Sequence, residues 1–247
     1  MMHFSKAVPS IPVQREMRLA AVAEARSQVV PKPSWSAIFV RALALVAAET
    51  PELRRVYLSF PWPHLYEHTV SIASVATERS DASARFVDFV RVRNPARHSI
   101  AVVDRYLRRV TKAARSNAGL ARFGSAITLL PWPLRRALWW CGLNLNGYFR
   151  ARAFGTFGLS VYSALGAESL HPLSPLSFLL NYGVISAEGN VNVRIVYDHR
   201  ITDGANIARA LAALEAALTG PLCDELLALA ATQRARRTAR PTSVGLS

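Results

Sequence analysis

Residues 191–204 read VNVRIVYDHRITDG, and this stretch decides the fold assignment. Its first seven residues loosely alternate apolar and polar side chains, which predicts a half-buried strand. His199 follows at the end of that strand, and Asp203-Gly204 then turns the chain into a predicted helix at 205–218. A side chain at a strand end can project into a cleft, and imidazole is well suited to move a proton near neutral pH. We therefore single out His199 as a candidate general base.

The short motif by itself leaves a plainer interpretation open, because an isolated histidine at a strand end is more often structural than catalytic. Asp203 can brace the loop, and Gly204 permits a close turn that a side chain would block. Tyr197 and Asp198 can brace the same loop, although Asp198 can equally serve only to bond backbone groups.

The surrounding sequence favours the catalytic interpretation through a family resemblance. Residues 198–204 resemble the Asp-His-Arg-x-x-Asp-Gly signature of the catalytic domain of 2-oxo acid dehydrogenase acyltransferases, and chloramphenicol acetyltransferase has a related His-His-x-x-x-Asp-Gly motif. Upstream, residues 155–160 (GTFGLS) are similar to the family's Gly-Thr-Phe-Thr-Ile-Ser strand, which places Ser160 on the family's catalytic serine. The resemblance extends over roughly residues 3–230 and is strongest from 155 to 218.

This resemblance implies a fold, a reaction and a set of roles. The fold is the chloramphenicol acetyltransferase-like α/β two-layer sandwich with a mixed sheet, assembled as a homotrimer. His199 acts as general base, Ser160 stabilises the oxyanion, and Asp203 supports the site. The active site lies between subunits, so His199 works with Ser160 of a neighbouring copy, and CoA enters through a channel. The residues that bind CoA are not identified by the motif.

Several departures from the family pattern narrow the expected function. The sequence shows no lipoyl domain and no peripheral-subunit-binding segment, Gly158 stands where the family commonly has threonine, and no arginine is evident as a partner of Asp203. We therefore expect a stand-alone acyltransferase that moves an acyl group from CoA, or from an acyl carrier thioester, to a small-molecule or lipid acceptor. The alternative is a non-catalytic trimeric scaffold or membrane-surface binding module derived from the same family.

Length and composition are consistent with one domain. The chain has 247 residues, 51% of them hydrophobic, which is enough to bury one large core. We expect the catalytic domain at 1–232, with a basic, tryptophan-rich and irregular insertion at about 117–153. The arginine-rich end, 233–247, is predicted to be disordered.

The net charge of +14 points to an anionic partner, which could be nucleic acid, a membrane or a phosphate-rich ligand such as CoA. No nucleic-acid-binding motif accompanies the charge, so we expect no nucleic acid partner. Between Arg105 and Arg152 the sequence has ten basic residues and no acidic one. Leu134, Leu138 and Trp139 can share one helical face there, as in an interfacial helix. We predict that 126–150 contacts an anionic membrane surface, while packing of the tryptophans in the core or at a subunit interface, or contact with a carrier protein, stays open.

Metal and disulfide chemistry find little support. The two cysteines, Cys141 and Cys223, build neither a disulfide framework nor a zinc site. His64 and His68 have no clear third ligand, so we expect no metal. We expect a cytoplasmic protein, with peripheral binding at the inner membrane face as a further option, because the sequence has neither a signal peptide nor a run of apolar residues long enough to span a bilayer.

Overall fold

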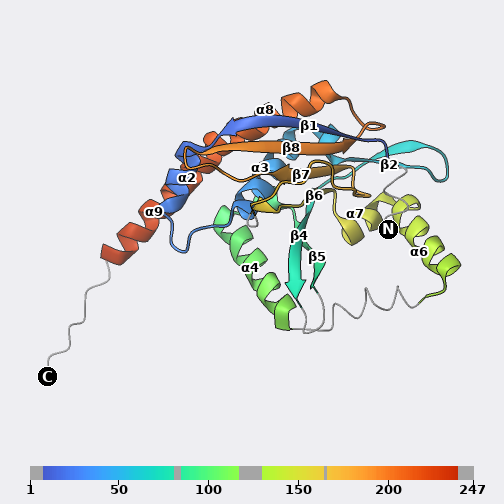
Figure 1. Cartoon of the computed structure of the whole chain (residues 1–247), viewed down its shortest axis with the longest axis horizontal. Helices are drawn as coiled ribbons and strands as arrows, with labels where there is room; N and C mark the ends of the chain where they lie inside the picture. Colours follow the sequence, from blue (N-terminus) through green and yellow to red (C-terminus); the bar gives the residue numbers. More distant parts are fainter. Residues whose placement is uncertain (1–7, 81–84, 117–129, 164–165, 239–247) are drawn as a thin grey trace.

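The computed structural model describes residues 8–80, 85–116, 130–163 and 166–238, which form one α/β unit (Figure 1). Its strands are β1 Ser10–Arg18, β2 Arg55–Leu58, β3 His64–Glu67, β4 Ile72–Ser80, β5 Arg85–Arg93, β6 Phe157–Leu159, β7 Phe178–Tyr182 and β8 Asn190–Asp198. Its α-helices are α2 Ala20–Ser27, α3 Trp35–Glu49, α4 Ile100–Ser116, α6 Trp132–Asn144, α7 Gly147–Phe154, α8 Gly204–Thr219 and α9 Pro221–Thr238. Two short 3-10 helices, η1 Pro51–Arg54 and η2 Pro95–Arg97, follow α3 and β5.

Six strands form one mixed sheet in the order β1-β8-β7-β6-β4-β5. Strand β6 pairs parallel with both β4 and β7, and the other neighbours pair antiparallel. Strands β2 and β3 form a separate hairpin. The α/β class with a mixed sheet, predicted from the sequence, is confirmed.

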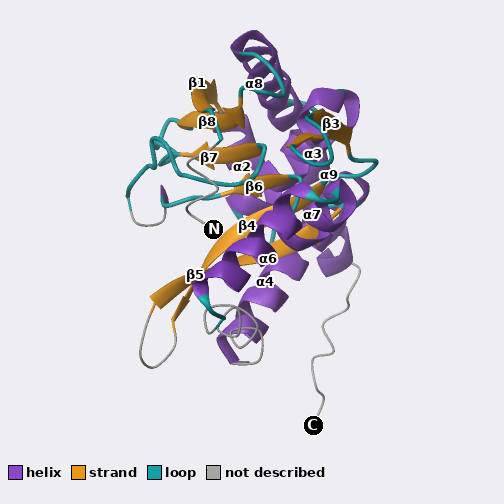
Figure 2. Cartoon of the chain, turned by 90° about the vertical axis from the view of Figure 1, so that its right-hand side faces the viewer, coloured by secondary structure: helices purple, strands orange, loops and turns teal. Residues whose placement is uncertain are grey.

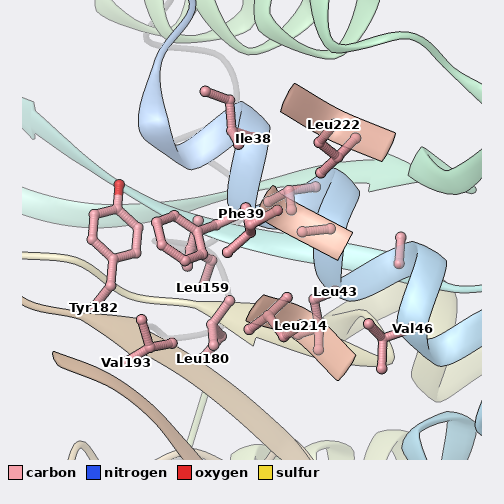
Figure 3. Close-up of a cluster of buried hydrophobic side chains, with 14 of the residues drawn as sticks. Ile38, Phe39, Leu43, Val46, Leu159, Leu180, Tyr182, Val193, Leu214 and Leu222 are labelled. Carbon is pink, nitrogen blue, oxygen red and sulfur yellow. The ribbon is translucent and has the colours of Figure 1, made fainter. Parts of the chain in front are cut away.

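The core lies between one face of the sheet and the helices α3 and α8 (Figure 3). Helix α3 is buried along most of its length, because it carries apolar residues on nearly every side, and Ser34 begins it by accepting a hydrogen bond from the Ala37 N–H at 3.3 Å. Phe39 of α3 stacks on Tyr182 of β7 with ring centroids 4.3 Å apart. The opposite face of the sheet is covered mainly by loops and carries the polar residues described below (Figure 2).

Two expectations about the segments of the chain need correction. The segment 117–153, expected to be irregular, contains the helices α6 and α7 in its described part, and Asn146 begins α7 by accepting hydrogen bonds from the N–H groups of Tyr148 and Phe149. The tail predicted from residue 233 starts too early, since α9 continues to Thr238. Gln233 fixes this last part, because its side-chain amide bonds both the N–H and the carbonyl of Val30. Residues 239–247 lie outside the described part of the chain.

No helix in the described residues is long and apolar enough to cross a membrane.

Candidate active site

Strand β8 carries His199 to one edge of the sheet. The strand is held on both sides, by β1 and β7, up to Asp198. The His199 N–H donates to the Pro9 carbonyl at 3.0 Å, and the Asp198 N–H donates to the Ser177 carbonyl at 2.9 Å. The backbone that bears the imidazole is therefore fixed, while the His199 side chain itself is exposed.

The imidazole of His199 is held in one tautomer. Its Nδ1 lies 3.0 Å from the carbonyl oxygen of Thr202. Because a carbonyl oxygen only accepts, Nδ1 must carry a proton, so in the neutral ring the lone pair is on Nε2. This is the state that a general base needs before it takes a proton from a hydroxyl or a thiol.

Asp203 is placed beside this loop but does not bond the imidazole. Its carboxylate accepts from the Asn206 N–H at 2.8 Å, which makes Asp203 the N-terminal cap of α8. The Asn206 side-chain amide in turn donates to the Thr202 hydroxyl at 3.1 Å. Asp203 therefore fixes the start of α8 and, through Asn206, the turn whose carbonyl orients His199.

The residues flanking His199 form an ion pair between a buried carboxylate and an exposed guanidinium, which the sequence motif does not reveal. Asp198 is 2% exposed, and its two carboxylate oxygens accept from Nε and Nη2 of Arg200 at 2.9 and 2.6 Å. The guanidinium of Arg200 lies over the ring of Tyr57, 4.2 Å from its centroid. The side chains on both sides of His199 are thus locked together and onto β2.

Arg150 of α7 holds the backbone segments around this region together. It is 7% exposed and donates to three backbone carbonyls, those of Tyr57, Leu143 and Pro175, at 3.1, 2.9 and 2.6 Å. Burial lowers the pKa of Arg150 to about 10, and the nearby Asp198 carboxylate opposes that shift. Arg150 remains charged at neutral pH and ties the insertion to β2 and to the segment before β7. Its position inside the insertion gave the sequence no signal of this role.

Ser160 follows directly after β6. Its N–H donates to the Leu180 carbonyl at 3.1 Å, its residue is 9% exposed, and its hydroxyl makes no hydrogen bond with the described residues. Gly158, two positions earlier, is explained by packing, since a Cβ there would come within 2.5 Å of Leu179 and 2.9 Å of Leu176. The threonine common in the family at this position would require the ends of the Leu179 and Leu176 side chains to move.

His199 follows the C-terminal end of β8 and Ser160 follows that of β6, but β8 runs antiparallel to β7 and β6, so the two residues lie apart along the sheet within one chain. Phe178 at the start of β7 pairs with Tyr197, near His199, whereas Leu180 further along β7 pairs with Ile195 and binds Ser160. Four residues along a strand span about 13 Å, and two strand spacings add about 10 Å sideways. The sheet therefore does not bring the two predicted catalytic groups together in a single subunit.

The described part of the chain holds no group of three or more His, Cys, Asp or Glu side chains that could bind a metal ion. A small cavity of about 50 Å³ lies elsewhere, lined among others by His68, Arg93, Tyr148 and Arg152. CoA is far larger than this cavity.

Comparison with known proteins identifies the fold. No family model matches the sequence, and no curated protein matches it. A probable dihydrolipoamide acetyltransferase from Listeria monocytogenes 4b F2365 is 18% identical, with a TM-score of 0.64 over 88% of this chain and 87% of that chain. The dihydrolipoamide acetyltransferase of Azotobacter vinelandii, studied for the role of a serine, a histidine and an asparagine in its mechanism, is 17% identical, with a TM-score of 0.63 over 89% and 85%. A truncated catalytic core of the 2-oxoacid dehydrogenase complex from Thermoplasma acidophilum is 14% identical, with a TM-score of 0.63 over 87% and 89%. At such identities the likeness establishes the fold and leaves the chemistry to be argued from the site.

Proposed function

We propose that this chain is a CoA-dependent acyltransferase that moves an acyl group from a thioester to a small-molecule or lipid acceptor. The observation that carries the proposal is the bond from Nδ1 of His199 to the Thr202 carbonyl, which leaves Nε2 as an exposed base on a fixed loop. The shared fold supports it. In the Azotobacter protein the histidine and asparagine under study lie four positions apart, and the same spacing separates His199 from Asp203.

The proposed reaction needs only side chains already described. Nε2 of His199 takes the proton from the acceptor hydroxyl or thiol as that group attacks the thioester carbonyl. The Ser160 hydroxyl donates a hydrogen bond to the oxyanion of the tetrahedral intermediate, a contribution typically worth about 3 kcal/mol. When the intermediate collapses, the carbon–sulfur bond breaks and the CoA thiolate leaves with the proton held by His199. Throughout, the Thr202 carbonyl accepts from Nδ1–H and stabilises the transient imidazolium.

The separation of His199 from Ser160 favours a site shared between copies of the chain. One subunit offers an exposed base after β8, and a second offers, after β6, a hydroxyl that has no partner in its own described residues. We place the thioester between them in a homotrimer, as the family resemblance implies. CoA, whose phosphates are anionic, fits the strongly basic charge of the chain.

The acceptor has a candidate route through an exposed apolar surface on α6, α7 and the β2–β3 hairpin, which lie at one end of the molecule (Figure 1). We call this surface the aromatic patch; its exposed large apolar residues are Phe60, Trp62, Leu65, Trp132, Leu134, Leu138, Trp140, Leu145, Tyr148 and Phe149. Phe60 of the hairpin meets Trp140 of α6 edge to face at 5.9 Å, and the Ser59 hydroxyl donates to the Asn144 side chain at 2.6 Å. These contacts make the hairpin and α6 one continuous surface.

Helix α6 is apolar on two opposite sides, which an ordinary surface helix is not. Its inner side packs through Leu143, which is 4% exposed, and through Trp139, which stacks on Phe154 at 5.5 Å. Its outer side shows Leu134 and Leu138, so the expectation that Trp139 shares their face is wrong. Arginines accompany the exposed rings, with Arg136 over Trp132 and Arg152 over Tyr148, each at 5.5 Å.

Our finer proposal is that the aromatic patch binds an anionic membrane surface or a lipid-like acceptor. Apolar anchors, tryptophans and arginines without an acidic residue from Arg105 to Arg152 are the combination that an anionic lipid interface selects. The part of the predicted region before residue 130 lies outside the described residues.

The acyltransferase proposal is tested by incubating the chain with acetyl-, octanoyl- and palmitoyl-CoA, with and without dihydrolipoamide as a thiol acceptor. Formation of free CoA is measured by chromatography. We expect His199→Ala to lower kcat at least about 100-fold, the usual scale for acid–base catalysis, with an unchanged unfolding temperature. Equal turnover by the variant would exclude His199 as the base, and no turnover by the wild type would favour the non-catalytic scaffold.

A further inference from the structure

A row of polar side chains crosses the sheet on the face opposite the helical core. The pairing register places Gln14 of β1 beside Arg194 of β8, and Arg194 beside Asn181 of β7. The next strand continues the row, because Leu159 pairs with Leu180, so Ser160 comes beside Asn181. Leu159 and Leu180 belong to the core face, and successive side chains alternate between faces. Ser160 and Asn181 therefore point to the same, opposite side.

The row is hydrogen-bonded at one end and lacks partners at the other. Arg194 donates to the Gln14 side-chain carbonyl and, at 2.5 Å, to the Ser169 carbonyl. Asn181 is 1% exposed, and its side-chain Nδ2 has no hydrogen-bond partner in the described structure. The Ser160 hydroxyl has none either. Two donors without partners thus lie side by side at the position where the proposed oxyanion forms.

A buried amide without a partner is unfavourable to the folded state, and a native chain rarely keeps one without a use. Apolar residues occupy the other positions of β7 except its last, a tyrosine, so a leucine or valine at 181 would be the expected choice for stability alone. The sequence itself carries a signal of such a role, because Asn181 is a polar side chain within a largely apolar strand.

We propose that the Asn181 amide is a second donor to the oxyanion bound by Ser160, an inference that rests on the proposed acyl transfer. Neighbouring strands lie about 4.8 Å apart, so two donors on adjacent strands can each reach one oxygen atom placed between them at about 2.9 Å. A donor that is shielded from water and already oriented acts strongly on charge that develops only in the transition state. Ser160 and Asn181 together bind the thioester oxygen as it becomes negative, while His199 of the neighbouring subunit takes the proton from the acceptor.

The test compares two substitutions of Asn181 that differ in whether the new side chain can donate a hydrogen bond. Asn181→Val and Asn181→Thr are similar in size and both suit a strand, but only threonine keeps an N–H or O–H donor. With acetyl-CoA and dihydrolipoamide, we expect Asn181→Val to lower kcat about 100-fold with KM for acetyl-CoA within about twofold. Asn181→Thr should recover at least about tenfold of that loss. Because valine removes a donor without a partner, its unfolding temperature should equal or exceed that of the wild type.

Asn192→Ala serves as a matched control, since Asn192 is an asparagine on the same face of β8 but outside the row. It should leave kcat within about threefold of the wild type. The inference is overturned if the threonine and valine variants have the same kcat, whether both are active or both inactive, or if valine lowers the unfolding temperature along with kcat. Absence of turnover in the wild type would instead overturn the acyltransferase proposal and the inference with it.

Discussion

At the scale of single residues, the candidate site depends on hydrogen bonds that fix protons rather than on unusual groups. His199 is an exposed imidazole whose proton is assigned by one carbonyl, that of Thr202. The turn that presents this carbonyl is held by Asp203 through Asn206. The hydrogen bond between the His199 ring and the Thr202 carbonyl therefore depends on the Asp203 cap of α8. Loss of that cap should disorder the His199 side chain without unfolding the chain.

His199 and Ser160 could be found from the sequence because each lies within a local motif that fixes its place at a strand end. Arg150 and Asn181 could not be found in this way. The three carbonyls that Arg150 binds come from β2, α6 and the segment before β7, which only the folded chain brings together. The role proposed for Asn181 depends on Ser160, its neighbour on the adjacent strand. Neighbours across a sheet are set by the strand register and not by distance in the sequence.

Because His68 is buried, we expect the stability of the fold to decrease at acidic pH. Burial, and then repulsion from Arg150, lower its pKa to about 4, against 6.5 for the free side chain. As the pH falls from 7 towards 4, the unfolded chain takes up a proton at His68 that the folded chain does not, so the free energy of unfolding decreases. The decrease is at most about 3 kcal/mol and ends below pH 4, where both states are protonated.

Thermal unfolding at pH 7 and pH 4.5 checks this prediction. His68→Gln removes the titrating group, so the variant should lose less stability over this interval than the wild type does. An identical loss in both proteins would show that carboxylates alone account for the acid sensitivity.

At the scale of elements, α6 and α7 form an addition that is anchored firmly but exposes much apolar surface. Gly147 permits this anchoring, since a Cβ there would lie 2.3 Å from the ring of Tyr66 in β3. The segment predicted to be irregular contains helices, and Pro133 is compatible with α6 because it lies in the first turn, where its missing N–H costs nothing. Sequence pattern alone could not say which side of α6 would face outward, since both sides are apolar.

The outer side of α6 predicts lipid binding. Wild-type protein should co-sediment with vesicles containing phosphatidylserine at low salt and bind neutral phosphatidylcholine vesicles more weakly. Each arginine near an anionic surface contributes about 1 kcal/mol, and this part weakens as salt is raised. Changing both Arg135 and Arg136 to glutamate should abolish the salt-sensitive part of the binding.

A matched variant separates the contribution of the arginine charges to vesicle binding from that of the inserted apolar side chains. Leu134→Ser with Leu138→Ser keeps the arginines and should remove the salt-resistant part of the binding. Wild-type protein that ignores anionic vesicles at low salt would contradict the membrane proposal and would leave a neighbouring protein surface as the partner of the patch.

At the scale of the whole molecule, the separation of His199 from Ser160 within one sheet predicts that activity requires assembly. Light scattering at micromolar concentration should give the mass of three chains. His199→Ala and Ser160→Ala should each be nearly inactive alone. When equal amounts are unfolded together and refolded, about one site in four should combine an intact histidine with an intact serine, because each site draws on two chains.

Free CoA formation by the mixture, compared with each variant alone and with wild type refolded in the same way, measures this recovery. A mixture no more active than its parts would place both groups in one subunit and contradict the shared site.

The same arrangement has a genetic consequence. Each chain gives its imidazole to one site and its hydroxyl to another. A copy that lacks both His199 and Ser160, incorporated with two normal copies, would silence two sites of three. Co-expression of such a chain with the normal one should therefore act as a dominant inhibitor, reducing activity by more than the fraction of defective chains.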